Sequence, residues 1–329
     1  MKKTSLFLGI LMAFSLLFSS CSDELQSQTS LEQRTTADIN IILKLDSINN
    51  DIMLSSPHKA NKGHNQDIDL SKWEKAQIVM ADARGAYSGS KKGATTGGRI
   101  GTFLGHPLAG GIIGGIVGGV VKGGLMSYVK YQRILNEHKK SMISPDKAAY
   151  GKATDLFKII MTDSMALSMN SIDFINPDVK VAISLKDSIL DLSNFKEAER
   201  NVGLAHNLTL AYLEGKITIN ENNLPLINKN TYVNAIINSE DFKRECIDIS
   251  TDDGNDVDSN DLPESVMRKF YAIYEQYAND CVDVAFIIQK YIEVIDSSNE
   301  LTPEEKKNVK YGLATALYST NYWEHEYKK

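Results

Sequence analysis

The residues with the clearest potential for chemistry are His206 and Asn207, which lie together in the apolar part of the segment Phe195–Leu213. A histidine there could bind a ligand or act as a base, because its ordinary pKa lies close to neutral pH. A helix-borne His and Asn more often satisfy backbone groups of a neighbouring segment. We therefore interpret the pair as a candidate polar site and expect its role to be structural.

The sequence contains none of the short motifs that identify common catalytic or cofactor sites. A zinc-protease H-E-x-x-H, a redox C-x-x-C and a hydrolase G-x-S-x-G are all absent. Gly93–Ile100 has the two glycines of a phosphate-binding loop at the right spacing, but Arg99 and Ile100 replace the required Lys and Ser or Thr. We expect no catalytic residues, no cofactor and no enzymatic activity.

The acidic stretch at residues 251–261 suggests calcium, because hard cations take several oxygen ligands. An EF-hand loop needs Gly at its sixth position, and Gly254 would place the loop's start at Ile249. Starting at Asp256 instead puts Asp261 where the glycine belongs. We therefore interpret the stretch as a solvated loop before the next helix and expect no metal site.

Cys246 and Cys281 lie in the C-terminal part of the chain. In an oxidising compartment they could pair, since loop-rich sequence lies between them. Two separate buried thiols are an equally acceptable interpretation, so the sequence leaves their pairing open.

Glycines at four-residue spacing dominate the stretch from Gly85 to Gly124. This spacing places small residues near one face of a helix, where another backbone can approach closely. A flexible linker would be more polar and would carry no period. The predicted helix-packing positions are Gly85, Gly89, Gly93, Gly97, Gly101, Gly105, Gly110, Gly114 and Gly118, with a parallel row at Gly111, Gly115, Gly119 and Gly123.

The glycine stretch divides at His106-Pro107, which predicts a reversal between two helices because Pro disfavours helical geometry in the residue before it. The first arm is polar and basic, and its Lys91, Lys92 and Arg99 could touch anionic lipid headgroups or form a solvated face. The second arm is apolar over Leu108–Val121, about 21 Å, which is shorter than a bilayer core of roughly 30 Å. A buried hairpin, an interfacial one and an oligomeric insertion all remain open.

The glycine stretch resembles the glycine-zipper segments of membrane-active and envelope proteins. That resemblance covers this part of the chain alone. It implies close helix-on-helix packing and association with a membrane or with further copies of the chain.

The first residues predict an exported protein. A basic start is followed by the apolar run Leu6–Phe18 and by Ser19-Ser20-Cys21. Small residues before a Cys resemble the lipobox of bacterial lipoproteins, which implies a lipidated N-terminus at Cys21. The acidic pair Asp23-Glu24 resembles the surface-export signal of Bacteroidetes lipoproteins. Together these resemblances imply a lipid-anchored protein of the outer membrane, exposed at the cell surface.

Composition and periodicity predict an all-α protein, and together with these resemblances they imply four parts. These are a signal peptide (1–20), a lipidated tether with a short helix (21–70), a glycine-zipper helical hairpin (71–140) and a C-terminal helical domain (141–329). Without residues 1–20 the net charge is −8, because that segment removes two lysines and no acid. An acidic balance argues against nucleic acid as a partner.

Helical patterns account for the C-terminal part, where no run of alternating strands is found. We expect helices over a core segment that includes Met161–Met169, and over Val179–Leu192, Phe195–Leu213 with Gly215 as its cap, Tyr232–Ile247 and Val266–Ile295. A capping box at Thr302 and Glu305 predicts a last helix that is anchored by Trp323.

Two local patterns, residues 203–207 and the set Ala316, Ser319, Tyr322 and Trp323, look like features of uncharacterised Bacteroidetes lipoproteins with a helical domain. The resemblance implies a location and a fold but no reaction. We therefore expect a lipid-anchored envelope protein whose hairpin associates with membrane or self-assembles. The alternative is a surface binding or scaffold module with the hairpin buried in its own helical domain.

Overall fold

The computed structural model describes residues 41–55, 70–137, 147–220, 230–247, 261–278 and 280–326. The predicted all-α class is confirmed: the described chain is helical apart from one small two-stranded sheet. Residues 41–55 form the short helix expected after the tether. The predictions for Cys21, Asp23 and Glu24, and all but the last residue of the acidic stretch 251–261, lie outside the described residues.

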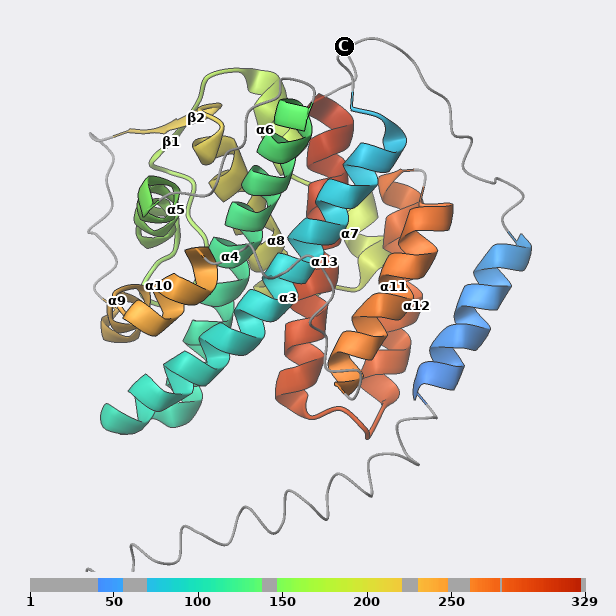
Figure 1. Cartoon of the computed structure of the whole chain (residues 1–329), viewed down its shortest axis with the longest axis horizontal. Coiled ribbons are helices and arrows are strands. Elements are labelled where there is room, and N and C mark those ends of the chain that lie inside the picture. Colours follow the sequence, from blue (N-terminus) through green and yellow to red (C-terminus); the bar gives the residue numbers. More distant parts are fainter. Residues whose placement is uncertain are drawn as a thin grey trace, which may run out of the picture.

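Two long antiparallel helices, α3 (Lys72–Phe103) and α4 (Pro107–Glu137), form the hairpin along the front of the body in Figure 1. Ser71 opens α3 with a capping box, in which its hydroxyl accepts from the Glu74 N–H and the Glu74 carboxylate accepts from the Ser71 N–H. The chain reverses through Gly105, whose φ of +84° suits a residue without a Cβ.

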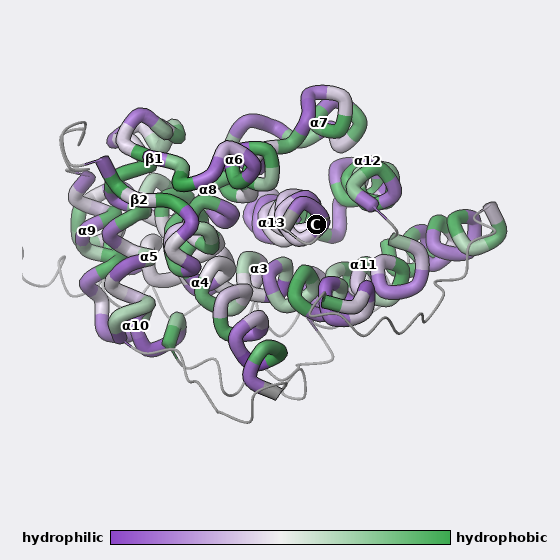
Figure 2. Tube along the Cα trace, turned by 90° about the horizontal axis from the view of Figure 1, so that it is seen from above, coloured by the Kyte–Doolittle hydropathy of each residue, from purple (hydrophilic) through white to green (hydrophobic). Residues whose placement is uncertain are grey.

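The last helix, α13 (Pro303–Glu326), runs through the middle of the molecule. It packs on α3, α8 (Glu197–Leu213), α6 (Pro177–Ile183) and α12 (Cys281–Ser297), and it lies between these helices when viewed end-on in Figure 2. The predicted capping box at Thr302 and Glu305 forms at its start. Trp323 is buried and stacks edge-on against Tyr322, with ring centroids 5.2 Å apart.

One side of α13 is covered by α11 (Leu262–Tyr277) and α12, and residues 41–55 contact these two helices. The expected single helix over Val266–Ile295 is wrong, because the chain leaves helical geometry after Tyr277 and Asp280 then caps α12. This break lets α12 turn back beside α11. Tyr291 of α12 donates to Asn49, whose amide in turn donates to the Lys269 carbonyl of α11.

The other side carries α5 (Lys147–Ile160), α9 (Thr231–Ile237) and α10 (Glu240–Ile247), whereas α7 (Asp187–Ser193) packs on α12. The predicted helix through Met161–Met169 is wrong: α5 ends at Ile160, and Met161 then forms an isolated bridge with Leu167. The segments Val179–Leu192 and Tyr232–Ile247 are helical as expected, but each divides into two short helices.

The small sheet pairs β1 (Ile172–Phe174) with β2 (Ile217–Ile219) in antiparallel register, with Ile172 opposite Ile219. Sequence analysis did not identify these strands. Gly215, at φ +73°, follows α8 and turns the chain into β2. The predicted cap at the end of α8 is therefore present.

The hydrophobic core is continuous between the hairpin and the C-terminal helices. Its fully buried members include Ile78 of α3, Val120 of α4, Leu208 of α8 and Leu317 of α13. The hairpin is thus part of the protein's own core over most of its length.

Candidate functional site

Three pairs of glycines lie opposite each other in the middle of the hairpin. They are Gly89 with Gly118, Gly93 with Gly114, and Gly97 with Gly110. A Cβ atom added to any one of the six would stand under 3.0 Å from backbone atoms of the facing helix, a separation that real Cβ atoms do not show. We call these six residues the glycine interface, and only glycine fits at each of them.

The remaining glycines of the predicted packing row have different surroundings. A Cβ on Gly85 would meet Met126 Sδ at 2.9 Å, and one on Gly101 would meet the His106 carbonyl oxygen at 2.6 Å. Gly105 is a correction to the prediction: it lies in the turn with open space where a Cβ would be, so it does not pack between helices. Its role is the positive φ angle of the reversal.

The second glycine row of α4 lies against α3 less closely and also borders α8. A Cβ on Gly115 or Gly119 would make ordinary contacts with Ser90 or Ala86 of α3. A Cβ on Gly123 would come 3.2 Å from His206 Cδ2, and one on Gly124 would come 2.7 Å from Thr209 Cγ2. This row therefore lets α8 approach α4 and places His206 against the hairpin.

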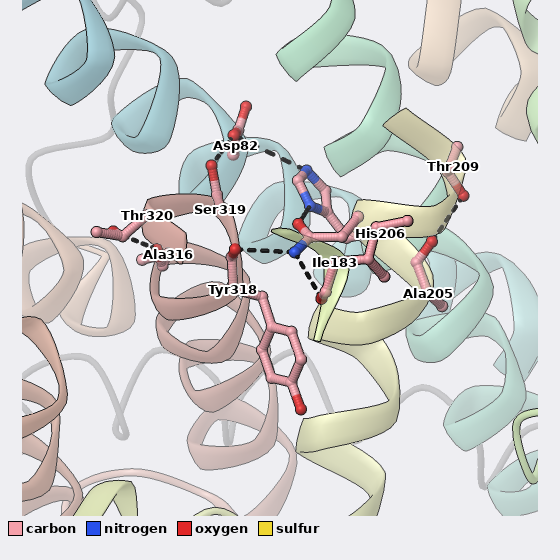
Figure 3. A network of polar contacts seen from close by, with 10 residues as sticks. Asp82, Ile183, Ala205, His206, Thr209, Ala316, Tyr318, Ser319 and Thr320 are labelled. Carbon is pink, nitrogen blue, oxygen red and sulfur yellow. Dashed lines mark hydrogen bonds and ion pairs between the residues drawn. The ribbon is translucent and has the colours of Figure 1, made fainter. Parts of the chain in front are cut away.

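Asn207 joins three segments of the core, and Figure 3 labels its partners His206, Ile183 and Tyr318. Its side-chain amide donates to the carbonyls of Ile183 (3.1 Å) and Tyr318 (2.8 Å). Because the amide nitrogen is the donor, Asn207 Oδ1 must be the acceptor for His206 Nδ1, at 3.1 Å. Sequence analysis expected this pair to satisfy backbone groups, and the geometry of Asn207 confirms that role.

Asp82 of α3 completes a buried polar cluster that also contains His206 and Ser319 of α13. Ser319 donates to Asp82 Oδ2, and His206 Nε2 lies 4.0 Å from the same oxygen, too far for a hydrogen bond. All three side chains have no exposed surface.

Burial sets the charge state of this cluster. It raises the pKa of Asp82 from 3.8 to about 7, against the opposing effect of hydrogen bonds from Ser319, Ser127 and Trp323. It lowers the pKa of His206 from 6.5 to about 4, although the Asn207 hydrogen bond acts in the opposite direction. The folded protein therefore keeps an uncharged imidazole near a carboxyl that is protonated below neutral pH.

The serine, histidine and aspartate of this cluster are not arranged for nucleophilic catalysis. A nucleophilic serine must give its proton to the histidine. Here Ser319 donates to the carboxyl instead, and no atom of the group reaches solvent. What the cluster can do is fix the relative positions of α3, α8 and α13.

Sequence analysis missed Asp82. The sequence feature that could have identified it is a single acidic residue on a helix face otherwise made of small and apolar side chains. Val79 and Ala83 lie beside it and Ala86 lies one turn further on. Such a residue is costly to bury, so it has a partner elsewhere in the fold. Ser319 and Trp323, which the sequence singled out, supply that partner.

Cys246 and Cys281 are separate buried thiols and form no disulfide within the described part of the chain. Burial raises the pKa of Cys246 to about 12. Cys281 Sγ instead contacts the Leu317 carbonyl oxygen at 3.9 Å. Among the described residues, no group of three or more His, Cys, Asp or Glu side chains could hold a metal ion.

Within the described residues, one helical stretch, Pro107–Asn136, is long and apolar enough to cross a membrane by length and composition. In its most apolar window 72% of the residues are buried inside the fold. A core helix of a water-soluble protein meets the same criteria, so the stretch is weak evidence for a span.

Comparison with known proteins finds no matching family model, no matching curated protein and no matching solved structure.

Proposed function

We propose that this chain is a lipid-anchored cell-envelope protein that works as a binding or scaffold module, with its glycine hairpin packed helix on helix inside its own helical domain. The anchor is Cys21, the membrane is the outer membrane of a bacterium, and the helical body faces the cell exterior. The observation that supports a self-contained hairpin is the occupation of both glycine rows within one molecule. One row faces the other arm, and the second contributes to the contact with α8.

Copies that assembled through these glycines would need a small-residue face free of partners. Gly93 and Gly97 already have Gly114 and Gly110 at backbone distance. Insertion of α4 into a bilayer would bury its apolar side chains again, but it would uncover the apolar faces of α8 and α13. It would also carry Lys122, which is buried here, into the hydrocarbon.

Membrane association or self-assembly through the hairpin is the second candidate function. The length and apolar character of Pro107–Asn136 favour it. The two candidates differ in a measurable way, because self-assembly makes the helical body oligomeric whereas a self-contained hairpin leaves it monomeric.

The experiment has two parts. Sedimentation of the chain without residues 1–21 should give a monomer, and a glycine-dependent oligomer would favour the second candidate. Growth with a labelled fatty acid should label the full chain, and Cys21→Ala should lose both the label and the outer-membrane fractionation. Cys246→Ala, which removes a buried thiol, is the matched control and should keep both.

Surface display is tested separately. Replacing Asp23 and Glu24 by Ala should reduce cleavage by protease added to intact cells. Unchanged cleavage would contradict the surface-export interpretation and would not test the lipid anchor at Cys21.

A further inference from the structure

The turn of the hairpin carries an exposed apolar tip. We define the tip as Phe103, Leu104, Leu108 and Ile112. Phe103 is 91% exposed and Leu108 is 83% exposed, and the other two are also exposed. Large apolar side chains gathered on a single projecting turn are unusual on a water-facing surface, where such residues are normally scattered.

The tip is held in a defined shape by backbone hydrogen bonds. Leu104 N–H donates to Ile100 O at 3.1 Å, and His106 N–H donates to Gly101 O at 2.8 Å. Gly110 N–H donates to His106 O at 3.1 Å, which ties the second arm to the turn. The apolar side chains are therefore presented by a folded turn.

The tip projects beyond the helical body. A surface hollow is lined by Thr95 of α3 together with Thr302 and Glu304 at the start of α13, so α3 passes the end of α13 at about Thr95. Ile100 and Ile113 still pack against the core, so the projecting part begins after Ile100, and three further residues, about 5 Å of helix, lead to Phe103. This length is comparable to the roughly 5–10 Å by which interfacial helices enter the headgroup region of a bilayer.

The tip and the start of the described chain lie at the same end of the molecule. The backbone N–H of Ile41 donates to Glu300 in the turn between α12 and α13, at 3.1 Å. That turn and the hairpin turn both lie at the lower end of the body in Figure 1. Twenty residues connect Cys21 to Ile41, and an extended chain of that length covers roughly 70 Å.

The charge of the hairpin suits a bacterial membrane surface. No acidic residue occurs between Asp82 and Glu137, although that segment contains seven Lys and Arg residues in a chain of net charge −6. Lys91 and Lys92 pair with Asp261 and Glu245. Arg99, the basic residue nearest to the tip, is exposed and has no ion pair within the described chain.

We infer that the tip is a second membrane contact, which enters the outer leaflet of a phospholipid bilayer with Arg99 at the anionic headgroups. The lipid at Cys21, which belongs to the function proposed above, would sit in the same membrane and orient the body. Insertion of the tip needs no rearrangement of the core, unlike a span through α4.

The test uses the chain without residues 1–21, which retains every described residue and cannot be lipidated. Its flotation is measured with vesicles of phosphatidylethanolamine and phosphatidylglycerol, and with vesicles of phosphatidylcholine. We expect flotation with the anionic vesicles. Phe103→Ser with Leu108→Ser should weaken it by roughly tenfold or more. Val282→Ser with Phe286→Ser, which removes exposed apolar side chains of α12, is the matched control and should not weaken it.

The depth to which the tip enters the bilayer is measured with a tryptophan placed at the tip and with brominated lipids, which quench its fluorescence. In Phe103→Trp the new fluorescence should be quenched. Trp73 is exposed about 45 Å away at the other end of α3, and its emission should not change. Arg99→Gln should weaken flotation with the anionic vesicles while leaving tip insertion into them detectable.

Three outcomes would overturn the inference. They are equal flotation of the parent and the tip variant, no flotation of the parent with either vesicle, and a tip-dependent dimer in the absence of lipid. A tip-dependent dimer would mean that a second copy of the chain, and not a membrane, covers the tip. Because the tested chain lacks Cys21, none of these outcomes depends on whether the lipid anchor exists.

Discussion

Gly93 and Gly114 face each other so closely that a Cβ on Gly114 would stand 2.7 Å from the carbonyl carbon of Gly93. A Cβ on Gly93 would stand 2.9 Å from the carbonyl carbon of Gly114. The two helices therefore touch through their backbones. Each interior glycine costs about 0.5–1 kcal/mol of helix stability relative to alanine. The close contact between α3 and α4, together with their burial against α8 and α13, must offset that cost.

A larger side chain in the glycine interface should destabilise the fold. We expect Gly114→Leu to lower the free energy of unfolding by about 1–3 kcal/mol or more, because the helices must move apart. Gly101→Leu should act in the same direction, since its Cβ would meet Pro107 Cα at 2.8 Å. The measurement is urea unfolding followed by circular dichroism.

The matched control for these variants is Gly98→Leu. Gly98 also lies in α3, but a Cβ there meets no atom within 4 Å. Leucine should stabilise this position by up to about 1 kcal/mol through its better helix propensity. Equal stability of the Gly114 and Gly98 variants would contradict the close backbone contact.

The buried pair Asp82 and His206 should show opposite dependences on pH. The pKa of Asp82 is raised from 3.8 to about 7, so its contribution to stability is complete below pH 3.8 and is lost as pH rises through about 7. The pKa of His206 is lowered from 6.5 to about 4, so its contribution is complete above pH 6.5 and is lost as pH falls through about 4. Between about pH 4 and pH 6.5 the two effects oppose each other.

Single substitutions should separate the two dependences of stability on pH. The stability of Asp82→Asn should rise with pH across this window, because the histidine effect alone remains. The stability of His206→Gln should fall with pH, because the aspartate effect alone remains. Urea unfolding at several pH values measures both. Two profiles as flat as the parent's would contradict both pKa shifts, and the imidazole resonances in NMR spectra would then report a ring that is protonated at pH 5.

Removing the amide of Asn207 should be costly. Asn207→Ala leaves the carbonyl of Ile183, at the end of α6, and Nδ1 of His206 buried without their partner, and each unpaired buried group costs about 1–3 kcal/mol. We therefore expect a loss of about 2–6 kcal/mol, measured by thermal or urea unfolding. Asn220→Ala, just after β2, removes only a long, exposed hydrogen bond to Asp173 and should change stability by at most about 0.5 kcal/mol. A similar change in both variants would contradict the structural role of Asn207.

Local physical chemistry was enough to predict several elements. The helical period of the glycines and the reversal before Pro107 predicted two packed helices, because a four-residue spacing defines a face without reference to the rest of the chain. The capping box at Thr302 and Glu305 and the turn at Gly215 were also predictable, since both depend on residues within one helical turn.

Chain reversals inside apolar segments were not predictable in the same way. The helical pattern runs from Val266 to Ile295 with Asn279 and Asp280 as a short polar interruption, and the helix breaks after Tyr277 so that α12 can pack back on α13. The methionine-rich stretch after Ile160 likewise leaves the helix and forms a bridge. In both places tertiary packing overrides a local preference worth well under 1 kcal/mol per residue.

The partners of the glycines and of the polar residues were decided by the tertiary structure alone. Sequence spacing defines two glycine rows but does not say which row meets α3 backbone to backbone and which one also admits α8. Asp82 and Ser319 are separated by 237 positions, and neither has a local motif that predicts the other. Their contact exists because a buried carboxyl needs a donor, and the donor can come from any segment that the fold brings within reach.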